Sequence, residues 1–375
     1  MDSVANNILN AIKNIDWKVV SIVEYFIFDF ISKKSLNANN ETKNNKYVLQ
    51  LDNSFIEDIK EIKLPPELII DYRSINFREL LEKEFGNTIV EFAQVIIDNF
   101  SAKNLINFYN NINELIINNK GKLQTINSIA SYSVKRNIIS VYENNQRIEL
   151  PPELFHMSSS FYDLINKIEY CGFGIKTISE NYQKIIGCGI TEGYTEYMVE
   201  KYYGEKHVET SNYNYQLLRK ITEKLEDVIG KDKMEQLYLN ANLRGLVDEL
   251  SIYMEEKDVL NFINYTDYIY NNLTIKEKTE YQKEELTVAL KFVNEFISKL
   301  YFSSAAKKYK EGKIIHYSEL ESIILKGCTS FDISIYDYQY DIVPTNQEYL
   351  DYAASAFKEY GIENIDIKIS DTKTK

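Results

Sequence analysis

The chain of 375 residues is long enough to bury a large core and to divide into two or three lobes. Its composition, 44% hydrophobic and 26% charged, is ordinary for a soluble globular protein and excludes wholesale disorder. Nucleic acid and anionic membrane surfaces need a basic face, so a net charge of −13 argues against both as main partners.

Cysteine usage and the first residues favour a reducing compartment. Cys171, Cys188 and Cys328 are odd in number and form no Cys-x-x-Cys pair, which favours free thiols. A Cys171–Cys188 bond remains an alternative because both flank one predicted loop. The N-terminus lacks a basic signal region, and the apolar segment 17–31 carries charges and is too short to span a bilayer. We therefore expect a soluble, cytoplasmic protein with no membrane insertion.

Helical periodicity dominates the first third of the chain, since five prolines and 13 glycines leave few helix breakers. The pattern predicts helices at 5–33, 53–61, 76–85, 88–100 and 101–118, and a short strand at 47–51. A β-like region follows at 122–132 and 138–143, of which 138–143 is the clearest strand. A turn at 143–147 then leads into a helix that contains residues 152–156.

The remainder alternates between glycine-rich turns and helices. Segments 170–174 and 186–190 are interpreted as two arms of a glycine-rich loop or hairpin. Helices are predicted at 192–203 (ended near Gly204), 218–228 (ended by Gly230), 232–239, 243–254, 256–271 and 276–310. In the tail, strands at 331–335 and 365–369 flank a helix that Thr345 caps and Gly361 ends.

These elements predict an α+β, mainly α protein with a small sheet and a helical C-terminal lobe. Three regions are expected: an N-terminal helical region at 1–120, a core with a helical lobe at 121–312, and a small α/β appendage at 313–375.

The most informative residues lie in the predicted helix at 152–156, Pro-Glu-Leu-Phe-His. In the H-E-x-x-H pattern, two histidines four residues apart bind one Zn²⁺, and the glutamate acts as general base toward a metal-bound water. Here Glu153 and His156 are present, but Pro152 stands at the first histidine position. Glu192 follows His156 by 36 residues, and Glu196 lies one turn further on the same predicted helix.

Residues 153–159 and 191–196 resemble the gluzincin metallopeptidases as they occur in low-GC bacteria, in order and spacing over roughly residues 120–255. The resemblance implies a zincin-like metallopeptidase fold. It also implies that Glu153 is the general base, that His156 and Glu192 are metal ligands, and that Glu196 supports a ligand histidine. Thr191 stands where the family more usually has asparagine.

Pro152 departs from the family pattern at the first ligand, because proline offers a metal no lone pair. With one ligand lost, we predict a catalytically inactive or impaired homologue that binds no zinc or binds it weakly, and that has a structural role or binds a peptide or protein. One alternative is an active zinc peptidase that recruits a replacement ligand, such as His207 or another carboxylate. A weaker alternative is a helical interaction protein with no peptidase ancestry, in which His156 is an ordinary half-buried histidine; His207 and His316 belong to no motif.

Overall fold

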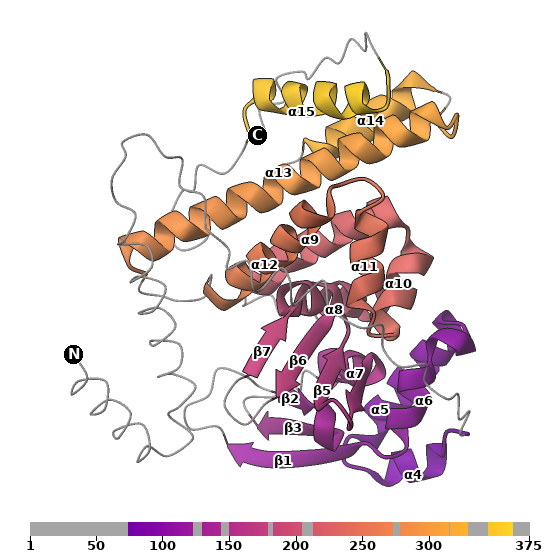
Figure 1. Cartoon of the computed structure of the whole chain (residues 1–375). Helices are drawn as coiled ribbons and strands as arrows, with labels where there is room; N and C mark the ends of the chain where they lie inside the picture. Colours follow the sequence, from indigo (N-terminus) through magenta and orange to yellow (C-terminus); the bar gives the residue numbers. More distant parts are fainter. Residues whose placement is uncertain are drawn as a thin grey trace, which may run out of the picture. The chain divides into compact units, whose positions relative to one another are not determined.

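A computed structural model describes residues 74–122, 130–143, 150–178, 183–204, 213–272, 278–314, 316–328 and 344–362. All of them belong to one compact unit of the chain, Leu51–Lys375. The described residues are mostly helical and include two small sheets (Figure 1), which confirms the α+β, mainly α prediction. The predicted helices at 5–33 and 53–61 and the strand at 47–51 lie outside these ranges.

The described part begins with short helices. They are α4 (Phe77–Glu82), α5 (Gly86–Asn99), the 3₁₀ helix η2 (Ala102–Asn104) and α6 (Ile106–Ile112). The helices predicted at 76–85 and 88–100 are confirmed as α4 and α5. The helix predicted at 101–118 is wrong beyond Ile112, because the helix ends there and, after a short turn, strand β1 (Ile116–Lys122) follows. Sheet pairing of the β-branched Ile116 and Ile117 overrides the helical pattern.

The first sheet precedes the predicted site helix in the chain, as expected. Its strand order is β1-β3-β2, with β3 (Ile138–Glu143) parallel to β1 and antiparallel to β2 (Ala130–Ser133). The 3₁₀ helix η3 (Val134–Arg136) joins β2 to β3. Ile139 and Val141 on β3 are fully buried, and this alternation explains why 138–143 was predicted correctly.

A second, four-stranded antiparallel sheet was not predicted. Its strands β4 (Ser160–Asp163), β5 (Ile168–Cys171), β6 (Gly174–Ile178) and β7 (Gln183–Ile186) pair in chain order. The predicted arm at 170–174 is the tight turn between β5 and β6, where Gly172 has a φ of +56°. The arm predicted at 186–190 is wrong, because β7 ends at Ile186 and a helix starts at Cys188. Strands of four or five residues leave too short an alternation to detect in the sequence.

Five described helices follow this sheet, and the first of them, α8, is largely buried. They are α8 (Cys188–Tyr203), α9 (Tyr213–Ile229), α10 (Lys231–Leu239), α11 (Leu243–Leu250) and α12 (Glu256–Asn272). Helix α8 contacts α7 (Leu150–Ser158), α9 and α12. A Cβ on Gly189 or Gly193 would lie 2.4 Å from a backbone carbonyl of α12 or α9, so only glycine permits these close approaches. Figure 1 shows α8 between the second sheet and the helices above it.

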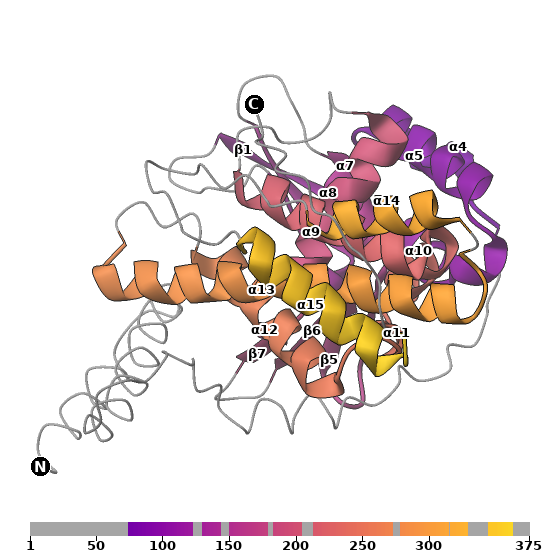
Figure 2. The ribbon, with the colours of Figure 1, turned by 90° about the horizontal axis from the view of Figure 1, so that it is seen from above.

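The last described helices form a second layer around the long helix α13 (Glu280–Lys310). Helices α14 (Tyr317–Gly327) and α15 (Asn346–Glu359) both pack against α13 (Figures 1 and 2). Thr345 caps α15 in a reciprocal capping box with Glu348, as the sequence predicted for this helix. Helix α14 was missed, and the strands predicted at 331–335 and 365–369 lie outside the described ranges.

A compact group of buried side chains, which we name the C-terminal cluster, joins these three helices. It consists of Phe302, Ala305, Ala306, Ile314, Leu320, Ile324, Tyr349, Ala353, Ala356 and Phe357. None of the described helices combines the length and the apolar character needed to cross a bilayer.

Candidate functional site

The segment with the H-E-x-x-H-like spacing forms helix α7, as predicted. Pro151 and Pro152 occupy its first turn, where a missing backbone N–H leaves no helical hydrogen bond unmade. Glu153 is half-buried in the same turn, and His156 follows one turn later with 9% of its surface exposed. The helix ends at Ser158, whose hydroxyl donates to the Leu154 carbonyl at 2.8 Å.

Helix α8 carries Glu192 and begins earlier than the sequence predicted. Gly187 precedes it with a φ of +78°, a conformation that favours glycine. The backbone N–H groups of Gly187 and Gly189 both donate to the Asp267 carboxylate, each at 2.7 Å. A carboxylate at a helix N-terminus satisfies unpaired backbone donors and complements the helix dipole. Asp267 on α12 therefore fixes the helix start one turn ahead of Glu192.

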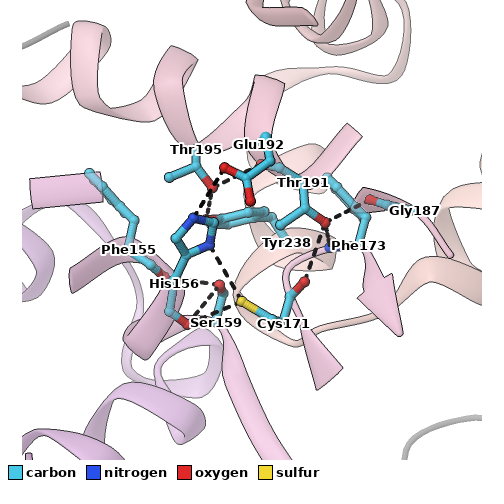
Figure 3. A network of polar contacts seen from close by, with 10 residues as sticks. All are labelled: Phe155, His156, Ser159, Cys171, Phe173, Gly187, Thr191, Glu192, Thr195 and Tyr238. Carbon is cyan, nitrogen blue, oxygen red and sulfur yellow. Dashed lines mark hydrogen bonds and ion pairs between the residues drawn. The ribbon is translucent and has the colours of Figure 1, made fainter. Parts of the chain in front are cut away.

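The two predicted ligand positions, His156 and Glu192, lie together. The His156 Nε2 atom is 3.6 Å from Glu192 Oε2 (Figure 3). Two ligands bound to one tetrahedral Zn²⁺ at ~2.0–2.2 Å each are about 3.4 Å apart. The separation in the structure is close to that value, so this pair has the spacing of two ligands of one ion.

Cys171 also lies beside the histidine, a contact that the sequence analysis did not predict. Its Sγ atom lies 3.4 Å from His156 Nδ1 and 3.6 Å from the His156 carbonyl oxygen (Figure 3). Cys171 ends β5, and the unpredicted second sheet is what returns it to α7. No local sequence signal shows this contact, because it depends on the pairing of β4 with β5. Cys171, Cys188 and Cys328 are all free thiols.

The two neighbours of His156 decide its charge. Burial tends to lower the pKa of His156, but Cys171 and Glu192 outweigh this effect and hold the pKa well above its usual range. Nε2 and a carboxylate oxygen repel each other unless a proton or a cation lies between them. An imidazolium between the Cys171 sulfur and the Glu192 carboxylate satisfies both ring nitrogens, whether its second proton comes from solvent or from the Cys171 thiol.

Buried hydroxyl groups on α8 and α10 form hydrogen bonds that hold the elements around His156 together. The Thr191 hydroxyl donates to the Gly187 carbonyl at 2.8 Å and accepts the Phe173 backbone N–H at 3.1 Å. Thr195 and Tyr238 share a hydrogen bond of 2.6 Å, and burial raises the pKa of Tyr238 to about 12. These bonds join α8 to the turn between β5 and β6 and to α10 (Figure 3).

The other predicted residues have the following places. Glu196 is buried in α8, one turn after Glu192, with 5% of its surface exposed. His316 is exposed immediately before α14, and His207 lies outside the described ranges. Whether Glu153 acts as a base and Glu196 as a supporting acid stays a prediction.

The described residues provide fewer ligands around His156 than a catalytic zinc site normally has. Across the ranges that the structure describes, no group of three or more His, Cys, Asp or Glu side chains is arranged to hold a metal ion. His156 turns one nitrogen toward Cys171 and the other toward Glu192, so one ion cannot bind both neighbours together with the histidine. His156 and Glu192 supply two ligands, whereas catalytic zinc normally has three from the protein.

Neither a protein-family model, nor a curated protein, nor a solved structure matches this chain. The resemblance to gluzincins therefore stays an expectation from the motif residues.

Proposed function

We propose that this protein is a gluzincin-type metallopeptidase relative with a silent catalytic site, retained to bind a peptide or protein or for a structural role. The approach of His156 Nε2 to Glu192 Oε2, at 3.6 Å, carries the proposal. These residues are 36 positions apart and sit on two helices, and a zincin-like site needs the same two positions to meet at one ion.

Pro152 accounts for the loss of chemistry. A histidine there would lie one helical turn before His156, on the same face of α7. Proline supplies no donor atom to a metal, so the retained pair lacks its third ligand. Without a bound ion, Glu153 has no metal-activated water on which to act as a base.

Restoring the missing ligand tests the proposal. Pro152→His should bind zinc at least ~10-fold more tightly than the parent in calorimetry, because the loss of a ligand exceeds the ~10–100-fold effect of an outer contact. The matched control is Pro151→His, which makes the same change one residue earlier, about 100° around the helix. The control should gain no affinity.

Two results would contradict the proposal. If folded Pro152→His binds zinc no better than Pro151→His, the site has diverged beyond its first ligand. If the unaltered protein is isolated with stoichiometric zinc, the alternative of an active peptidase with a replacement ligand is favoured.

A further inference from the structure

Cys171 is a nucleophilic side chain that lies against the ionisable pair of the site. Its Sγ atom lies 3.4 Å from His156 Nδ1, and the residue is partly exposed at the end of β5. The opposite ring nitrogen, Nε2, faces Glu192, whose side chain is 24% exposed. Thiol, imidazole and carboxylate thus stand in series, with a different ring nitrogen toward each neighbour (Figure 3).

This order is the one that activation of a nucleophile requires. A base within reach of the nucleophile takes its proton, and a third group orients the base. Glu192 is in position to fix the His156 ring so that Nδ1 points at the thiol.

The backbone around Cys171 indicates which class of reaction fits. Acyl transfer needs donors free to stabilise a developing oxyanion. Near the thiol, the Gly172 N–H already donates to the Ser159 carbonyl at 2.9 Å, and the Phe173 N–H donates to the Thr191 hydroxyl at 3.1 Å. Because these two N–H groups already have acceptors, they are not available to stabilise an oxyanion. The site therefore favours a reaction in which the negative charge develops on the leaving group. Thiol–disulfide exchange is such a reaction, because the departing sulfur carries the negative charge.

We propose that Cys171 is a modification site for low-molecular-weight disulfides, with His156 as the base and Glu192 as the positioning residue. Cys171 Sγ attacks one sulfur of the disulfide and forms a new S–S bond with it. The original S–S bond breaks, and the leaving thiolate receives the proton that His156 took from Cys171. The products are a mixed disulfide on Cys171 and one free thiol. The reaction uses the same side chains as the proposed function but needs neither zinc nor peptidase ancestry.

The test uses the full chain carrying Cys188→Ala and Cys328→Ala, so that Cys171 is its sole cysteine. The probe is dithiodipyridine, a neutral aromatic disulfide whose released thione absorbs light, in a buffer with a chelator. At pH 7 the native chain should react roughly 10-fold or more faster than the same chain unfolded in urea. His156→Gln should remove most of this acceleration, and Glu192→Gln should remove part of it. His316→Gln, which changes an exposed histidine outside the site, is the matched control and should have no effect.

The proposal is overturned if native Cys171 reacts no faster than in the unfolded chain, or if folded His156→Gln reacts as fast as the parent. The comparison with urea needs no variant at the site, so it remains decisive even if His156→Gln does not fold. Failure of Pro152→His to bind zinc would not affect these rates, so the two proposals can fail separately.

Discussion

At the scale of a single residue, the charge on one histidine contributes to the stability of the fold. His156 has a thiol on one ring nitrogen and a carboxylate on the other, and the pKa of His156 is raised well above its usual range despite burial. A histidine whose pKa rises on folding stabilises the protein fully below its unfolded pKa of ~6.5, and that contribution is lost as pH rises through the folded pKa.

We therefore expect His156→Gln to reduce the free energy of unfolding more at pH 6 than at pH 9. Urea denaturation at both pH values measures this difference. The exposed His316→Gln serves as the control and should change stability little at either pH. An equal loss for His156→Gln at both values would show that the imidazole is not charged in the folded protein.

At the scale of single elements, the start of α8 depends on one buried carboxylate from α12. Burial raises the pKa of Asp267 to about 7, although the backbone N–H groups of Gly189 and Gly187 act in the opposite direction. An acid whose pKa rises on folding binds its proton more tightly in the folded state. Its stabilising contribution is complete below the unfolded pKa and is lost between about pH 4 and pH 7.

Asp267→Asn should consequently lower the free energy of unfolding more at pH 5 than at pH 8. The stability of the parent falls relative to the variant by at most ~1.4 kcal/mol for each pH unit in this window, whereas the amide does not titrate. Urea unfolding curves at several pH values test this. A deficit that stays the same from pH 5 to pH 8 would mean that Asp267 is ionised throughout this window and pairs with the helix start as a charge.

The same elements show what local sequence patterns predict. The capping residue Thr345, the stop at Gly230 and the alternation in β3 are local signals, and each marks its element correctly. The start of α8 was misplaced because Asp267 acts on it from 80 residues away in the chain. At the site, it was the resemblance to gluzincins that implied a pairing of His156 with Glu192, and the two side chains lie 3.6 Å apart. Cys171 could not be found in this way, because only the pairing of β4 with β5 places it beside His156.

At the scale of the described unit, α13 takes part in two buried regions. Near its middle, Phe296 stacks on Phe262 of α12 with ring centroids 4.3 Å apart. Its C-terminal part supplies Phe302 to the C-terminal cluster, to which α15 contributes Phe357. A helix shared between two groups of buried side chains allows the smaller group to open locally while the larger remains folded.

Phe357→Ala should therefore loosen the C-terminal cluster without unfolding the helices that hold the site. Removing a buried phenylalanine, here 2% exposed, costs ~3–5 kcal/mol. In native-state hydrogen exchange, we expect amides of α14 and α15 to exchange faster, while those of α7 and α8 keep their protection. Phe262→Ala is the matched variant in the larger region and should lower protection in α8 as well, because α12 packs against it. If Phe357→Ala weakens protection equally in α8 and α15, the described unit unfolds as a single cooperative body, and the C-terminal cluster has no independent opening.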